Sequence, residues 1–197
     1  MLPSGERAVV AARHGRSWLF SFRQATARVC TFVGGKTDAR KELVHVSVLD
    51  ELRNDEIARE LLASTELARL AYTWKDGTPR VVPVVFHWTG TEIVVASPVA
   101  APKVKVLESR PDVAVTIDGT TWPYHALLVR GTAKVERMDQ VVPEYALACE
   151  RYFGPEAGQA WVAGLEGRRM TWARIAITPT KVTILDFETR FPSAISA

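Results

Sequence analysis

The chain has 197 residues, 47% of them apolar, and a formal net charge of +3, which is typical of one globular domain and unlike a disordered chain. Its two cysteines, Cys30 and Cys149, are too few for a disulfide framework and too far apart for a metal knuckle, which favours a reducing cytoplasm. No apolar run approaches the roughly 18 residues that a membrane helix needs, so we expect a soluble, cytoplasmic protein with no membrane partner.

Charge is distributed unevenly along the chain. Residues 1–45 contain 8 basic and 3 acidic residues, whereas the remainder contains 17 basic and 19 acidic residues. We therefore expect a basic, poorly ordered N-terminal extension over residues 1–45 and a slightly acidic folded domain over residues 46–197. The extension lacks interleaved aromatic residues and a recognition helix, so nucleic acid is not an expected partner.

The first half of the domain predicts one helix followed by hairpins. Leucine and isoleucine recur at helical spacing after Asp50, which is placed to cap the helix. Asp76-Gly77 and Thr89-Gly90 are typical of tight turns between strands. The elements expected here are a helix at 50–63, strands at 67–74, 80–88 and 93–97, and turns at 75–78 and 89–90.

The second half continues with strands and inserted helices. Gly131 interrupts a long β-type run and predicts a bulge or a close backbone approach. The elements expected here are a short helix from Lys103 halted by Pro111, strands at 113–117 and 127–135, helices at 139–153 (capped by Asp139) and 156–165, and a final hairpin of strands 172–177 and 181–187. Six or seven mostly antiparallel strands with helices between them predict an α+β fold, a small β-barrel with helices outside.

Ser97 and Lys103 form the strongest candidate binding site. Ser97 ends a strand, and Pro98 and Pro102 prevent regular structure between it and Lys103. The two residues should therefore flank a short loop that leads into a helix, where free N–H groups and the lysine charge favour an anion such as phosphate. The alternative is that Lys103 is an ordinary solvated lysine in the first turn of a surface helix.

The order of these features resembles a known family, the pyridoxamine 5'-phosphate oxidase-like flavin-binding split barrels. The resemblance covers residues 50–187. It rests on the run Val81–Phe86, the Ser97 and Lys103 pair, Leu107, the run Arg110-Pro111-Asp112-Val113, and the run Val129-Arg130-Gly131-Thr132-Ala133. It implies a split β-barrel fold and a homodimer with two cofactor sites at the interface.

The resemblance also implies roles for individual residues. Val82, Pro83 and Val84 would contact the isoalloxazine ring, and Ser97 and Lys103 would bind the cofactor phosphate. Trp122 or Tyr124 of one subunit would cover the ring bound to the other subunit.

The chain departs from the vitamin-forming oxidases of that family. Phe86 and Pro102 stand where those enzymes carry basic residues, and Arg190-Phe191-Pro192-Ser193 replaces their Arg-x-His substrate motif. The resemblance therefore implies a smaller relative that binds FMN or the 8-hydroxy-5-deazaflavin coenzyme and reduces a small organic substrate. FMN is favoured, because the acidic tail of the deazaflavin needs further basic groups and Lys105 points about 200° away from Lys103 on a helix.

Side-chain catalysts are not evident in the sequence. The chain has no paired carboxylates for general acid–base chemistry, and its four histidines are too scattered for a metal site. A flavin carries hydride equivalents in its own ring, so the protein needs only to bind and shield it. We expect a flavin- or deazaflavin-dependent oxidoreductase with catalytic residues unassigned. The alternative is a non-catalytic module that binds such a cofactor or haem.

Overall fold

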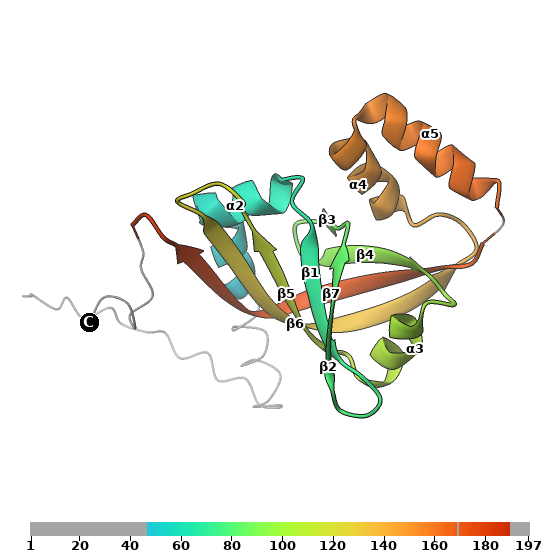
Figure 1. The fold of residues 1–197 in the computed structure, drawn as a ribbon, viewed down its shortest axis with the longest axis horizontal. Helices are drawn as coiled ribbons and strands as arrows, with labels where there is room; N and C mark the ends of the chain where they lie inside the picture. The colour runs from blue at the N-terminus through green and yellow to red at the C-terminus, as the bar shows by residue number, and fades with distance from the viewer. Residues whose placement is uncertain (1–46, 169, 190–197) are drawn as a thin grey trace, which may run out of the picture. The chain divides into compact units, whose positions relative to one another are not determined.

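The computed structural model describes residues 47–168 and 170–189, so the expected extension over residues 1–45 lies outside the described residues. One seven-stranded antiparallel sheet holds the described part together, with the strand order β2-β1-β5-β6-β7-β4-β3 (Figure 1). Its strands are β1 (Ala68–Thr73), β2 (Pro79–Val84), β3 (His87–Trp88), β4 (Ile93–Pro98), β5 (Asp112–Asp118), β6 (His125–Met138) and β7 (Trp172–Asp186).

Five helices accompany this sheet in the described residues. They are residues 47–54, α2 (Glu56–Ala63), α3 (Pro102–Ser109), α4 (Pro143–Phe153) and α5 (Pro155–Glu166). None of these described helices is long and apolar enough to span a membrane. Gly154 joins α4 to α5 with a φ of 85°, a conformation that glycine adopts without steric cost.

The connection between β2 and β3 explains why the fold is a split barrel. These two strands are the opposite edges of the sheet, yet only Val85 and Phe86 separate them in sequence. The sheet must therefore curl until its edges meet at this point, although it does not close through hydrogen bonds. The expected α+β split barrel is confirmed. The expected single strand at 80–88 is instead two strands: β2 pairs antiparallel with β1, as expected from the Asp76-Gly77 turn, and β3 pairs with β4.

Two apolar clusters fill the two faces of the sheet. Ile93 and Val95 of β4 point into the main core with Phe86 and the α2 face, as the period of two in a strand requires. Val94, from the same strand, points to the other face and packs in a second cluster with residues that include Val142 and Leu165. This second cluster attaches the α4–α5 pair to the sheet.

Two expected helix caps are wrong. The helix expected at 50–63 is divided at Asp55, and it is Asp55, not Asp50, whose side chain accepts from the Ala58 N–H at 3.1 Å. The helix expected from Asp139 begins at Pro143, because proline is favoured in the first helical turn and Val142 precedes it as the N-cap. Pattern reasoning located both helices and misplaced their starts.

The expected final hairpin at 172–187 is also wrong. Residues 172–186 form one strand, β7, which pairs with β6 along its length and with β4 over its first half. Pro179 lies opposite Gly131, and the register shifts next to it, so that the Thr180 hydroxyl donates to the Arg130 carbonyl oxygen at 3.2 Å. A proline within a strand is tolerated at such an irregularity. The expected close approach at Gly131 is confirmed.

Candidate functional site

Strand β2 presents a free backbone edge at the split of the barrel. Val82, Pro83 and Val84 pair with β1 on one side, and β2 has no strand partner on its other side among the described residues. The Val82 and Val84 side chains are half-buried and pack against the main core, while Pro83 is exposed. A ligand along this edge would therefore meet backbone groups rather than the valine side chains.

Ser97 places a hydroxyl in a nearly dry position. The residue is 2% exposed and pairs with Ala173 of β7 near the end of β4. It follows Ile93 and Val95 at the strand period, so it shares their face of the sheet. Serine is rarely so buried unless its hydroxyl has a structural or binding role. Ser97 lies directly before the loop that leads to α3.

Lys103 lies in the first turn of α3, after a tight connection from β4. The Ala101 N–H donates to the Pro98 carbonyl oxygen at 2.9 Å, and Pro102 begins the helix. Lys103 is half-buried, and this burial lowers the pKa of its ammonium group below the usual 10.5. No carboxylate in the described part of the chain forms an ion pair with Lys103. A half-buried cation without a counter-ion differs from an ordinary solvated lysine, and an anion beside it would offset the desolvation.

Trp122 does not join the other candidate residues within one chain. It lies in the loop between β5 and β6, is 68% exposed, and contacts Tyr124 with a ring-centroid distance of 5.2 Å. Lys103 lies on α3 just before β5 begins, and the seven residues of β5 span about 23 Å. Figure 1 shows α3 and the β5–β6 loop at opposite ends of β5. Trp122 therefore lies far from Lys103 within one chain.

Sequence reasoning missed a cluster of arginines around Trp88. Arg53, Arg59 and Arg151 line one pocket with this tryptophan, although they come from the helix at 47–54, from α2 and from α4. No local motif links these positions, so only the fold brings them together.

A protein-family model matches most of the described residues. A family model for pyridoxamine 5'-phosphate oxidase matches residues 55–183, a range that contains β2, Ser97, Lys103 and Trp122. The chain belongs to this family. The resemblance found in the sequence is thereby confirmed.

Solved structures with the same fold include two at a TM-score of 0.50. An F420 reductase is 26% identical, with a TM-score of 0.50, and the match covers 62% of this chain and 93% of that chain. A conserved hypothetical protein from Mycobacterium tuberculosis is 18% identical, with a TM-score of 0.50 and coverage of 73% and 84%, which shows the fold alone. A comparison with curated proteins gave no match.

Proposed function

We propose that the protein is an oxidoreductase that binds a flavin-type coenzyme and transfers hydride between it and a small organic substrate. One observation carries the proposal: the half-buried Lys103, without a carboxylate partner among the described residues, follows the buried hydroxyl of Ser97 across one short loop. This pair is suited to a phosphate group, which a flavin mononucleotide and a deazaflavin coenzyme both carry. The family match supports the same class of coenzyme.

The chain's own groups would bind, orient and shield the coenzyme. A bound flavin-type coenzyme supplies the hydride chemistry in its ring. Lys103 and Ser97 would hold the phosphate, and the free edge of β2 along Val82, Pro83 and Val84 would fix the ring through backbone groups. Pre-organised contacts of this kind set the position of the reacting ring, which is the protein's main contribution to such a reaction.

Two coenzymes fit this arrangement for different reasons. The likeness to an F420 reductase, which extends over 93% of that chain, favours F420, an 8-hydroxy-5-deazaflavin. The single cation at the start of α3 favours FMN, because the longer acidic tail of F420 needs further basic groups and Lys105 is exposed on another side of the helix. We place F420 first, because a likeness over a whole domain carries more information than one missing charge.

A homodimer completes the proposed site. Trp122 and Tyr124 are exposed at one end of β5, about 23 Å along the strand from the α3 end of the same chain. In a two-fold dimer each subunit would bring these rings over the coenzyme bound by its partner. Their exposure in a single chain is then the expected state of an interface residue.

Identification of the bound coenzyme followed by turnover tests the proposal. Protein purified without added coenzyme should release F420 or FMN under denaturing mass spectrometry. The reduced coenzyme on the protein should then be reoxidised by a quinone such as menadione faster than the free coenzyme is. A bound chromophore that no acceptor reoxidises would instead support a non-catalytic binding protein, and release of haem would contradict the proposal outright.

A further inference from the structure

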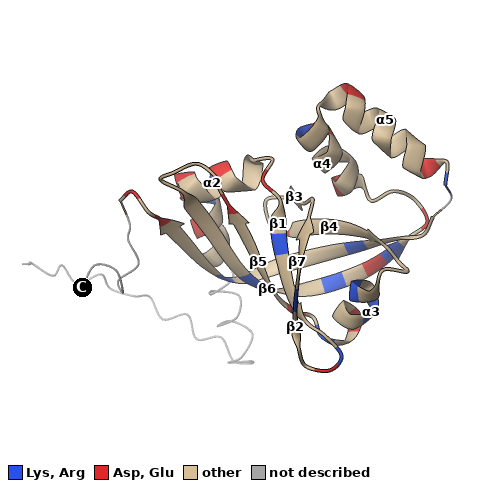
Figure 2. Cartoon of the chain, viewed as in Figure 1, with Lys and Arg blue, Asp and Glu red and all other residues tan. Residues whose placement is uncertain are grey.

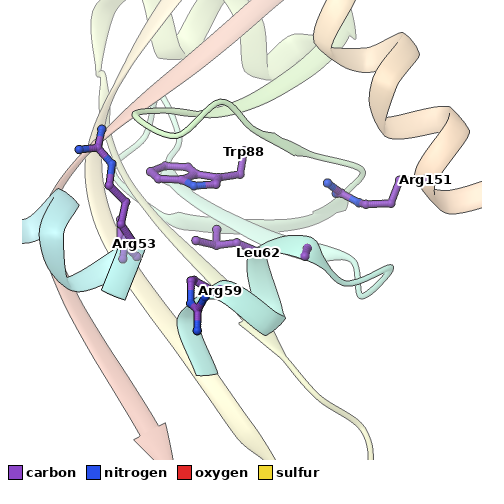
Figure 3. A pocket seen from close by; sticks show the side chains of 7 residues that line it. Arg53, Arg59, Leu62, Trp88 and Arg151 are labelled. Atoms are coloured by element: carbon purple, nitrogen blue, oxygen red, sulfur yellow. The ribbon is translucent and has the colours of Figure 1, made fainter. Parts of the chain in front are cut away.

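A pocket of about 400 Å³ has none of the candidate coenzyme residues in its lining. It is lined by Leu52, Arg53, Arg59, Leu62, Ala63, Trp88 and Arg151. Three of these residues are arginines, none is acidic, and the others are apolar. Figure 3 shows Arg53 and Arg151 on opposite sides of the Trp88 ring, with Leu62 next to it. The pocket therefore combines a strong positive charge with an apolar, partly aromatic wall.

Arg151 is held in a fixed orientation but is not neutralised. Its Nη2 donates to the Phe86 carbonyl oxygen at 2.6 Å, and its guanidinium carbon lies 4.9 Å from the Phe86 ring centroid and 5.1 Å from that of Tyr152. These contacts orient the guanidinium group. Its Nε is buried without an acceptor among the described residues, and no described carboxylate forms an ion pair with it. A buried donor and an uncompensated charge at one place favour an anionic ligand.

Arg53 supplies a second oriented cation across the pocket. Its Nε donates to the Gly90 carbonyl oxygen at 3.0 Å, which ties the side chain to the turn between β3 and β4. This turn also positions Trp88, so Arg53 and the indole ring form one unit. No carboxylate of the described residues pairs with Arg53, so its charge is available to a ligand.

We propose that this pocket binds a small organic carboxylate with an aromatic or aliphatic body. The carboxylate matches the planar fork of a guanidinium group and would pair with Arg151, whereas Arg53 adds positive charge from the other side of the Trp88 ring. The body would pack against Trp88, Leu52 and Leu62. Inorganic phosphate suits the pocket less well, because most of the wall is apolar and gives it few additional donors.

The pocket is separate from the proposed phosphate site. Trp88 pairs with Ile93, and Ser97 lies four residues further along β4, a distance of about 13 Å along the strand. The inference therefore does not rest on the proposed function, and it can be tested whether or not a coenzyme binds.

Calorimetric titration of the full-length protein tests the proposal, with 2-naphthoate and its uncharged isostere 2-naphthamide as probes. The structure predicts that 2-naphthoate binds at least about tenfold more tightly than 2-naphthamide, because only the acid forms charge-assisted hydrogen bonds. Arg151→Lys should weaken the binding of 2-naphthoate about tenfold, because the fork of the guanidinium group is lost. Arg53→Gln should weaken it by about two- to threefold through loss of a nearby positive charge, and both variants should bind 2-naphthamide like the parent protein. Trp88→Leu should weaken the binding of both probes.

Arg168→Gln is the matched control, because Arg168 is an exposed arginine just after α5 and does not line this pocket. It should bind 2-naphthoate like the unaltered protein, and saturating FMN should not change that affinity. Arg53 is exposed and its side chain is tied to the fold by its hydrogen bond to Gly90, so its variant tests the charge even if Arg151→Lys fails to fold. The proposal would be overturned if both probes bound with equal affinity or if 2-naphthoate did not bind at millimolar concentration. It would also be overturned if Arg53→Gln and Arg168→Gln lost the same affinity for 2-naphthoate, or if FMN displaced 2-naphthoate.

Discussion

Gly131 of β6 lies so close to Thr178 of β7 that a Cβ atom at residue 131 would stand 2.6 Å from the Thr178 carbonyl oxygen. The Ile177 side chain would be only 2.8 Å away. We therefore expect Gly131→Ala to lower the free energy of unfolding by about 1–3 kcal/mol, because the two longest strands would have to separate locally. Urea denaturation measures this change.

Gly164 provides the matched control for this substitution. It lies in α5, and an added Cβ would meet no atom within 4 Å. Gly164→Ala should raise the free energy of unfolding by about 0.5–1 kcal/mol, since alanine has less backbone freedom to lose in a helix. Similar effects at residues 131 and 164 would show that the close approach of β6 and β7 is not a constraint on the fold.

Arg174 of β7 is the ionic link between the sheet and α4. Its Nη2 donates to Glu144 at 2.7 Å and to Glu92 at 3.2 Å, and Glu136 lies 3.5 Å from its Nη1. Figure 2 shows acidic and basic segments side by side on β6 and β7. Arg174→Met should lower the free energy of unfolding by about 1–3 kcal/mol, because it leaves partly buried carboxylates without a counter-ion.

Lys134→Met is the control for the ionic link, because it removes an exposed partner of Glu136. Exposed pairs contribute little, so the melting temperature should stay within error of the parent. Thermal denaturation of both variants measures the difference. An Arg174→Met protein as stable as the parent would show that α4 is held by its apolar contacts alone.

Asp186 should make the stability of the domain sensitive to acid. A hydrogen bond from the Thr189 hydroxyl, with others from the Glu188 and Thr189 backbone N–H groups, lowers the pKa of Asp186 to about 2 from its usual 3.8. Because the pKa is lower in the folded state, the contribution of this carboxylate is complete above about pH 5 and is lost as the pH falls towards 2.

Asp186→Asn tests this pH dependence. The variant should be less stable than the parent at pH 7, and the difference between the two free energies of unfolding should shrink between pH 5 and pH 2. Urea denaturation across this range measures the difference. A difference that stays constant with pH would show that the ionised Asp186 carboxylate does not stabilise the fold.

Most of the fold could be predicted from local sequence patterns, since alternating apolar residues and turn signatures located six of the strands. The errors arose where a distant contact overrides a local signal. Thr178-Pro179-Thr180 is a good turn sequence, but pairing with β6 keeps it within β7, and Gly131 makes room for it. Asp50 is a good capping residue, yet the chain places Asp55 at the helix start.

Part of the candidate coenzyme site could be predicted from the sequence for the same reason. Ser97 and Lys103 are six residues apart, so a single loop joins them and their spacing carries information. The pocket around Trp88 could not be predicted from the sequence, because Arg53 and Arg151 lie on helices almost a hundred residues apart and no spacing rule links them. Trp122 was selected by resemblance, and it lies at the end of β5 away from α3 in the same chain.

The affinity of Lys103→Ala for FMN and F420, compared with that of Lys105→Ala, tests the central claim most directly. Both lysines lie on α3, but only Lys103 is half-buried, whereas Lys105 is exposed. Lys103→Ala loses a charge-assisted contact to phosphate, so its affinity for the native coenzyme should fall by about 10- to 100-fold. The affinity of Lys105→Ala should be unchanged. If the two variants bind both coenzymes with the affinity of the parent protein, Lys103 does not hold a phosphate and the proposed site is wrong.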